Sequence, residues 1–323
     1  MSFSHFADSN LLAVHSVDEF VFSVPDLVVA RHFYENFGLN VRDEEDGWLS
    51  LYTYHHSHRW GRIVHDAGNP KRLRWLTFGV YPQDFRRFAQ LFAERNVPLI
   101  TPPAGAGRDA LGDALWVQGP DGLPIQLRVA AKCSPSGFGP REFPPAPGLG
   151  RRAKPRSKQQ RVQPRHLSHV LMFTADVDKA REFYEGILGL RLSDRSGSLI
   201  AFLHTPHGSD HHLIALAKSG GGGLHHTSWC VPSIDEVGQG AQQMVRAGYR
   251  EGWGLGRHVL GSNYFYYVRD PWGSYAEYSF DIDYIAAGQE WPAGDHPAED
   301  SLYAWGPDVP EEFVFNAEIT VPA

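Results

Sequence analysis

Apolar and polar residues alternate with strand and then helix spacing along this chain, and the same succession occurs twice. Residues 20–39 (FVFSVPDLVVARHFYENFGL) and 170–190 (VLMFTADVDKAREFYEGILGL) each begin with an apolar run of strand length and continue with helical spacing up to a glycine. Asp26 and Asp176 lie where a helix N-cap is expected. The pattern therefore predicts a strand and a helix in each half, and an internal repeat.

A second strand and helix follow in each half. These strand–helix pairs are 75–80 (WLTFGV) with 85–96, and 226–231 (HTSWCV) with 234–248. Each half then ends with strands around a glycine-containing turn, at 119–129 and 270–280. The chain thus predicts four units of one strand, one helix and several further strands, paired into two domains.

The region between the two repeats differs in composition. Residues 132–165 contain seven prolines and a dense run of arginine and lysine, which predicts a solvated linker without packed elements rather than a nucleic-acid site. We expect an N-terminal domain over 1–131 and a C-terminal domain over 166–283. Residues 284–323, rich in Trp, Pro and Asp, predict a tail wrapped over one of the domains.

The composition is that of a globular protein. The 323 residues are 42% hydrophobic and 21% charged, with a formal net charge of −7, which excludes a disordered or fibrous chain and disfavours a nucleic-acid partner. No apolar run is long enough to cross a membrane, and the N-terminus lacks the pattern of a signal peptide, so we expect a cytoplasmic protein. Cys133 and Cys230 are too few for a disulfide framework, whereas 17 histidines and many carboxylates could bind a metal.

Three segments carry a resemblance to a known family. They are LSHVLMFTADVDKAREFYEGILGL, DHHLIALAKSGGGGLHHTSW and GRHVLGSNYFYYVRDPWGSYAEYS. In this order they resemble the vicinal-oxygen-chelate superfamily, and within it the type I extradiol ring-cleavage dioxygenases, over about residues 15–285. The resemblance implies an α+β fold of two domains, each a pair of βαβββ modules that form a curved, barrel-like mixed sheet. It also implies one Fe(II), or occasionally Mn(II), in the C-terminal domain.

The resemblance places the metal ligands at His169, His226 and Glu277. Two neutral imidazoles and one carboxylate suit a non-haem Fe(II) that keeps positions open for substrate and O2. The three residues belong to three separate predicted strands, so only a closed-up sheet could bring them together.

The first half lacks this ligand set. With Phe33 aligned on Phe183, Glu19 is opposite His169. The strands 75–80 and 226–231, aligned with each other, place Trp75 opposite His226, and the aligned Pro-x-Gly turns place Gln126 opposite Glu277. Glu, Trp and Gln do not make a metal site. The first domain is therefore expected to be metal-free. Four histidines of the first half have no carboxylate at a matching position and are interpreted as exposed loop and strand residues: His55, His56, His58 and His65.

Three further residues are candidates for catalysis. His212 resembles the family's acid–base catalyst, and strand alternation allows only one of His211 and His212 to face the pocket. His258 and Tyr267 resemble side chains that donate hydrogen bonds to the bound substrate. Packing in the core remains an alternative for Tyr267, because tyrosines are dense in this strand.

The implied function is extradiol cleavage of a substituted catechol by O2, giving a hydroxymuconic semialdehyde type of product. We expect a catecholic substrate and O2 as partners, no nucleic acid, no membrane, and a homo-oligomer. Two alternatives remain open. One is another metalloenzyme on this fold, such as a glyoxalase-like lyase or a 4-hydroxyphenylpyruvate-type dioxygenase, and the other is a metal-free aromatic-binding protein. The ring substituent and the choice between Fe and Mn are not determined.

Overall fold

The first half consists of two strand–helix–strand modules. The computed structural model describes residues 11–45, 47–106, 114–135 and 155–319. The first-half elements are β1 (Ser16–Val24), α1 (Leu27–Phe37), β2 (Asn40–Asp43), β3 (Leu49–Thr53), β4 (His56–His65), β5 (Arg72–Val80), α2 (Pro82–Glu94), β6 (Ala114–Gln118), the 3-10 turn η2 (Pro120–Gly122) and β7 (Pro124–Val129). They form one sheet in the order β2-β3-β4-β1-β5-β7-β6.

The second half repeats this plan. Its elements are η3 (Arg156–Lys158), β8 (His166–Thr174), α3 (Val177–Leu188), β9 (Arg191–Ser196), β10 (Ile200–His204), β11 (Ser209–Asp210), β12 (Ile214–Lys218), β13 (Gly223–Cys230), α4 (Ile234–Arg246), β14 (Gly252–His258), β15 (Tyr264–Arg269) and β16 (Tyr275–Phe280). Its main sheet has the order β18-β9-β10-β12-β8-β13-β16-β15-β14-β19, in which the two outermost strands, β18 (Gly294–Asp295) and β19 (Tyr303–Trp305), come from the tail. The predicted α+β fold of paired βαβββ modules is confirmed.

The helices begin and end where the sequence predicted. The Asp26 carboxylate accepts hydrogen bonds from the backbone N–H groups of Val28 and Val29, and Asp176 caps α3 in the same way. Gly38 and Gly189 then end the two helices with φ of 104° and 74°, a left-handed conformation that glycine adopts without steric cost.

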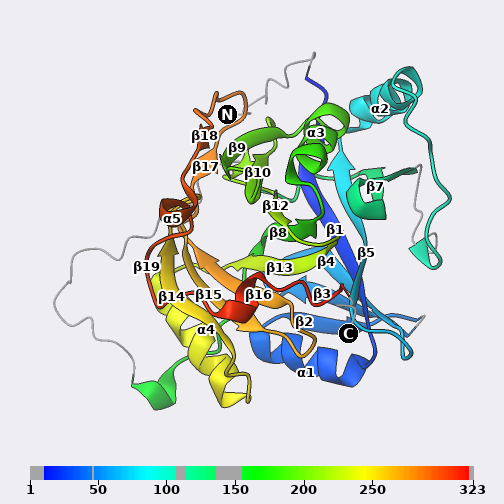
Figure 1. Ribbon diagram of the computed structural model, residues 1–323. Helices are drawn as coiled ribbons and strands as arrows, with labels where there is room; N and C mark the ends of the chain where they lie inside the picture. The colour runs from blue at the N-terminus through cyan, green and yellow to red at the C-terminus, as the bar shows by residue number, and fades with distance from the viewer. Residues whose placement is uncertain (1–10, 46, 107–113, 136–154, 320–323) are drawn as a thin grey trace, which may run out of the picture.

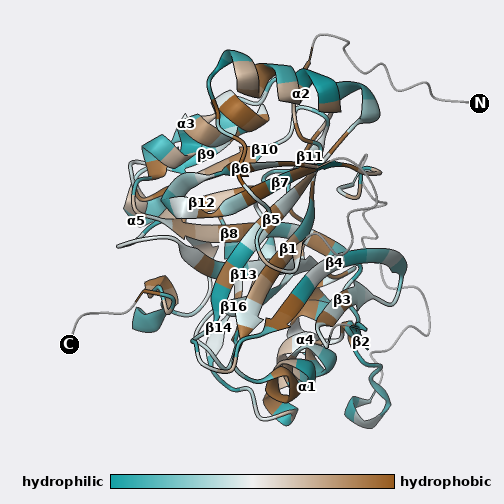
Figure 2. Ribbon diagram, turned by 90° about the vertical axis from the view of Figure 1, so that its right-hand side faces the viewer, coloured by the Kyte–Doolittle hydropathy of each residue, from teal (hydrophilic) through white to brown (hydrophobic). Residues whose placement is uncertain are grey.

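The two halves pack through one continuous hydrophobic core (Figure 1). Phe37 of α1 stacks on Tyr278 of β16 at 4.0 Å between ring centroids, and the Tyr278 hydroxyl donates to the backbone oxygen of Phe37 at 2.7 Å. Helices α1 and α4 lie side by side at one end of the molecule. Figure 2 shows both hydrophobic and hydrophilic residues on α2 and α3, as expected for helices with one face against a sheet.

The segment 132–165 packs at both of its described ends, which differs from the expectation of a fully solvated linker. Ser134 and Val162 are buried, and Val162 belongs to the shared core. The basic residues Arg156, Lys158 and Arg161 are exposed, as predicted. Residues 136–154, including the rest of the basic run, lie outside the described part of the chain.

The tail follows β16 back over the second half. Its elements are β17 (Tyr284–Ile285), β18 (Gly294–Asp295), α5 (Ala298–Ser301), β19 (Tyr303–Trp305) and η4 (Glu311–Val314). Strand β18 pairs with β9 and strand β19 pairs with β14, so the tail reaches both edges of the ten-stranded sheet. Among the described residues, no helix has the length and hydrophobicity needed to cross a membrane.

Candidate active site

Strand register brings the three predicted ligands to one face of the second sheet. Strand β13 lies between β8 and β16, and its Ser228 is directly opposite both His169 of β8 and Glu277 of β16. Directly paired residues share a face, as do residues two apart on one strand. His226, two residues before Ser228, therefore joins His169 and Glu277 on that face.

The three donor atoms converge on one point. The Nε2 atoms of His169 and His226 are 3.2 Å apart, and they lie 3.3 and 3.5 Å from Oε2 of Glu277. Two ligands held at right angles about 2.1 Å from one ion lie about 3 Å apart, so this triangle has the size of one face of a metal coordination shell. All three side chains are buried.

The hydrogen bond at Nδ1 of His169 determines which of its ring nitrogens is protonated. The Ser168 hydroxyl donates to Oδ2 of Asp210 at 2.6 Å, so its oxygen is left to accept a hydrogen bond from Nδ1 of His169 at 3.2 Å. With the proton on Nδ1, the Nε2 atom of His169 presents a lone pair to the convergence point.

His226 is held in the same tautomer by a different chain of contacts. Nε2 of His225 donates to the backbone oxygen of Phe313 at 2.7 Å, which leaves Nδ1 of His225 to accept from Nδ1 of His226 at 2.6 Å. His226 therefore also presents an unprotonated Nε2. Because neither Nε2 atom of the facing pair carries a proton, their 3.2 Å approach is not a hydrogen bond.

Glu277 completes a site that fits a metal ion. Asn263 donates to Oε1 of Glu277 at 3.0 Å, whereas the buried Oε2 atom accepts no hydrogen bond within the described structure. Two lone pairs and a carboxylate oxygen face one another at this point, an arrangement that is costly unless a cation lies between them. The donor set thus fits a divalent transition metal.

His212 lies over this triangle with a relay behind it. Its ring is 4.0 Å from that of His169, and its Nδ1 is 3.1 Å from Nδ1 of His211, whose Nε2 contacts Asp194 at 2.8 Å. Burial, together with the neighbouring histidines, lowers the pKa of His212 well below its ordinary value, so the imidazole is neutral near pH 7. Its Nε2 is thereby available to accept a proton.

The strand alternation used to choose between His211 and His212 does not extend to them. Strand β12 begins only at Ile214, so both histidines lie in the preceding turn, and both are buried. His212 nevertheless lines the cavity, and His211 lies behind it against Phe202 and Trp291.

His258 and Tyr267 lie together beside Glu277 and His226. The Tyr267 hydroxyl is 2.9 Å from Nε2 of His258, and the backbone oxygen of Leu302 in the tail lies 2.7 Å from Nδ1 of His258. Burial lowers the pKa of His258 and raises that of Tyr267 well above its ordinary value. Tyr267 therefore remains a protonated hydroxyl beside the site.

A cavity of about 400 Å³ opens over these residues. It is walled mainly by apolar side chains, which include Leu171, Phe202, Leu260, Leu302, Phe313 and Val314. The last three belong to the tail, so the tail forms part of the cavity wall as well as covering the sheet. A flat, largely apolar molecule fits such a space.

The chain is similar to known proteins over nearly its whole length. Residues 166–278 match the Glyoxalase/Bleomycin resistance protein/Dioxygenase superfamily. The chain is 52% identical over 307 residues to metapyrocatechase 2 of Cupriavidus necator, covering 95% of this chain and 93% of that protein. The chain belongs to the extradiol dioxygenases of this superfamily.

Solved structures share the fold of this extradiol dioxygenase. The crystal structure of the Mn(II)-bound glyoxalase from Novosphingobium aromaticivorans has a TM-score of 0.74 at 19% identity, with 94% of each chain covered. The crystal structure of 2,2',3-trihydroxybiphenyl 1,2-dioxygenase from Sphingomonas wittichii has a TM-score of 0.71 at 20% identity, covering 92% of this chain and all of that one.

The first half of this extradiol dioxygenase has the same strand register as the second half, but other residues stand at the counterparts of the proposed ligand positions. Thr77 is opposite both Glu19 and Gln126, as Ser228 is opposite His169 and Glu277. Gln126 accepts from the Thr77 hydroxyl at 2.8 Å. The alignment of the two halves made from the sequence is thus confirmed at the level of strand pairing, and the counterpart positions are filled by structural contacts.

The sequence did not identify the groups that orient the ligands of this extradiol dioxygenase. They are Ser168, Asp210, His225, Phe313 and Asn263. Ser168 and His225 each precede a ligand directly, so a polar neighbour beside a candidate ligand was a usable signal. No sequence signal indicated the contact of His225 with the Phe313 backbone, because that contact depends on where the tail packs.

Proposed function

We propose that this extradiol dioxygenase cleaves a catechol with Fe(II) bound by His169, His226 and Glu277. The observation that supports the ligand assignment is the convergence of two unprotonated Nε2 atoms and a carboxylate oxygen without a hydrogen-bond partner. A bound Fe(II) would supply coordination for the two catechol oxygens and for O2, and a redox path between them. Mn(II) accepts the same donors and is the alternative ion.

His212 is proposed as the acid–base catalyst. Its neutral Nε2 can take a proton from a catechol hydroxyl as the substrate enters the cavity, and the resulting imidazolium is stabilised through His211 by the Asp194 carboxylate. The same nitrogen would later return a proton to an oxygen atom of the reacting group.

His258 and Tyr267 are proposed to position the substrate oxygens. The backbone oxygen of Leu302 occupies Nδ1 of His258, which leaves its Nε2 and the Tyr267 hydroxyl as a hydrogen-bonding pair at the cavity surface. These two groups lie beside His226 and Glu277, whereas His212 lies against His169, so the two oxygens of a bound ring would have distinct surroundings.

The cavity wall favours apolar ring substituents. Lys218 is the lysine among the lining residues, and one of its three donors binds the backbone oxygen of Ala175. Because the wall is mainly apolar, alkyl or aryl catechols are expected to be better substrates than carboxylated catechols, whose charge is costly to bury.

The test is a panel of alkyl, aryl and carboxylated catechols assayed in air after anaerobic loading with Fe(II). We expect oxygen uptake together with a yellow ring-fission product. Glu277→Gln should abolish both, and His65→Gln, a change at an exposed first-half histidine, is the matched control. A fully metal-loaded protein that leaves the whole panel unreacted would contradict the proposal.

The two other functions considered from the sequence have weaker support. A metal-free binding protein would leave the buried Oε2 of Glu277 facing two lone pairs. A glyoxalase-like lyase requires a further protein ligand, and Glu19, the counterpart of His169 in the other half, is engaged by Arg59 and Arg62.

A further inference from the structure

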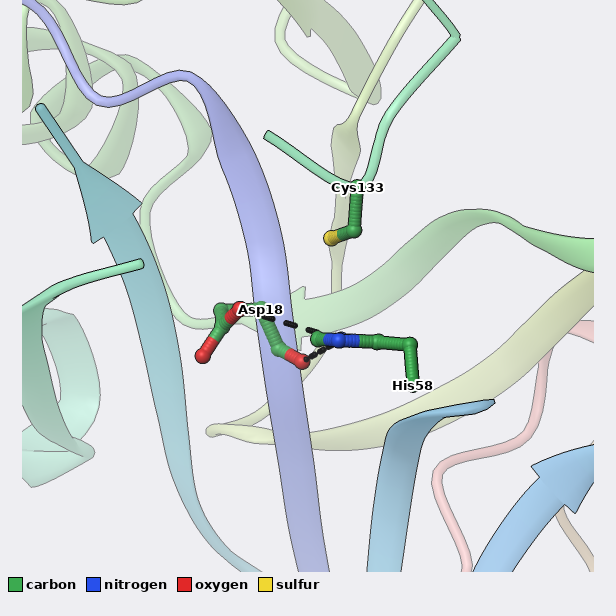
Figure 3. A group of neighbouring side chains, drawn as sticks. All are labelled: Asp18, His58 and Cys133. Carbon is green, nitrogen blue, oxygen red and sulfur yellow. Dashed lines mark hydrogen bonds and ion pairs between the residues drawn. The ribbon is translucent and has the colours of Figure 1, made fainter. Parts of the chain in front are cut away.

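A second group of metal-ligand side chains lies in the first half. Asp18 of β1, His58 of β4 and Cys133, four residues after the end of β7, each offer one donor atom, and these atoms lie within 4.8 Å of one another. Figure 3 shows the His58 imidazole pointing toward Asp18, with Nε2 of His58 3.7 Å from Oδ1 of Asp18. A carboxylate does therefore lie beside one of the first-half histidines, contrary to the sequence interpretation.

Asp18 and Glu19 contact different partners, so the Asp18 group is separate from the first-half counterpart of the active site. Register between β1 and β5 shifts between Val17 and Glu19, so Asp18 is an extra residue in the strand. Such a bulge redirects a side chain relative to its neighbours. Glu19 contacts the arginines on β4, whereas Asp18 contacts His58 and Arg128.

The carboxylate of Asp18 has one oxygen without a hydrogen-bond partner. Arg128 donates to Oδ2 at 2.5 Å, but Oδ1 is buried and accepts no hydrogen bond from the described residues. Its 3.7 Å separation from Nε2 of His58 is too long for a hydrogen bond. A buried carboxylate oxygen without a partner is destabilising, so Oδ1 calls for a ligand between it and its neighbours.

We propose that Asp18, His58 and Cys133 bind a thiophilic divalent cation such as Zn(II). Sulfur, imidazole nitrogen and carboxylate oxygen are the donors that zinc uses in proteins, and donors about 2.0–2.3 Å from one tetrahedral ion lie about 3.3–3.8 Å apart. The ion would link β1, β4 and the start of the segment 132–165. Three protein ligands leave the fourth tetrahedral position to a water molecule, and the group lies outside the residues that line the active-site cavity, so the ion is assigned a role apart from ring cleavage.

Binding moves one proton to solvent and one within an imidazole. The Cys133 thiol loses its proton to solvent, and the thiolate and the Asp18 carboxylate offset the two positive charges of the ion, while Arg128 leaves one positive charge at the site. The thiol gives up its contact with the backbone oxygen of Val17, and the proton that Nε2 of His58 donates at 2.7 Å to the backbone oxygen of Asp18 moves to Nδ1, so that Nε2 can bind the ion. Arg128 keeps its contact with Oδ2.

Cobalt substitution distinguishes this site from the active site. The full chain is freed of metal and titrated with Co(II), because a thiolate ligand gives an intense near-ultraviolet charge-transfer band and the set His169, His226 and Glu277 contains no sulfur. We expect the band in the wild-type protein and in Glu277→Gln. Cys133→Ser should abolish it, and Cys230→Ser, at the other cysteine, is the matched control that should retain it.

A second variant covers the case in which Cys133→Ser fails to fold, which circular dichroism would reveal. His58→Gln keeps the thiol, and we expect it to raise the Co(II) dissociation constant read from the same band by about tenfold or more. The proposal is overturned if saturating Co(II) gives no sulfur band in the wild-type protein, if the band depends on Cys230, or if His58→Gln binds as tightly as the wild type. None of these readouts involves catechol cleavage, so this test and that of the proposed function fail independently.

Discussion

Glu19 occupies in β1 the position that His169 occupies in β8. Glu19 is directly opposite Thr77 of β5, as His169 is directly opposite Ser228 of β13. The carboxylate of Glu19 is fully buried, and its two oxygens accept from Arg59 at 2.7 Å and from Arg62 at 2.8 Å. The first-half counterpart of His169, a proposed metal ligand, is thus part of a buried ion pair.

Glu19→Gln should lower the free energy of unfolding by about 3 kcal/mol, because it leaves two guanidinium groups facing a neutral amide in the interior. Urea denaturation measures the change. Glu35→Gln removes an exposed partner of Arg31 and should cost less than about 1 kcal/mol. Equal losses of stability in the two variants would show that the burial of Glu19 does not determine the effect of Glu19→Gln.

His212→Gln should lower kcat by about 10²–10⁴-fold with little change in the amount of metal bound, because it removes the proton acceptor and keeps the ligands. Steady-state oxygen uptake and metal analysis of the same preparation measure the two quantities. Loss of metal in parallel with activity would instead place His212 in the metal site.

Phe313→Ala should destabilise the protein by about 3–5 kcal/mol and raise KM, because the ring is buried in the tail against His225 and Tyr267 and lines the cavity. Thermal unfolding and catechol titration measure the two effects. Phe315, two residues on, is 55% exposed, so Phe315→Ala is the matched control. An unchanged KM in Phe313→Ala would show that the tail covers the sheet without shaping the cavity.

Mn(II) should stabilise the metal-free protein through the site in the second half. An ion present at 100 times its dissociation constant adds about 2.7 kcal/mol to the free energy of unfolding. Mn(II) is chosen because it prefers nitrogen and oxygen donors over sulfur. The stabilisation should disappear in Glu277→Gln, and its persistence there would mean that Mn(II) binds elsewhere.

His15 should make folding stability fall with acidity. Burial lowers the pKa of its imidazole from 6.5 to about 4, so between these values the unfolded chain binds a proton that the folded chain does not. The stability contributed by the neutral ring is complete above about pH 6.5 and is lost as pH falls toward 4, by about 3 kcal/mol in all. His15→Gln should flatten this part of the urea-denaturation profile, and a profile with an unchanged slope would contradict the assignment.

Local pattern predicted the elements and the relation between the halves. Asp26 and Asp176 act within their own helix ends, so their capping role follows from spacing alone. The alignment that placed Glu19 opposite His169 needed only the shared Phe-Tyr pair, because each module repeats the same strand register.

Contacts between segments far apart in the sequence could not be predicted from such local patterns. The tautomer of His226 depends on the backbone oxygen of Phe313, some 90 residues later in the chain, and no local signal links the two. The proximity of Asp18 and Cys133 likewise arises only when the chain after β7 returns to β1. The bulge that redirects Asp18 is a deviation from the strand alternation on which the sequence interpretation relied.

The two short strands of the tail change how the ten-stranded sheet can meet other molecules. Without β18 and β19, strands β9 and β14 would present rows of unpaired backbone N–H and C=O groups, which are templates for intermolecular strand addition and aggregation. The chain covers part of both borders with short strands of its own, and short edge strands disfavour edge-to-edge pairing of this sheet with another molecule.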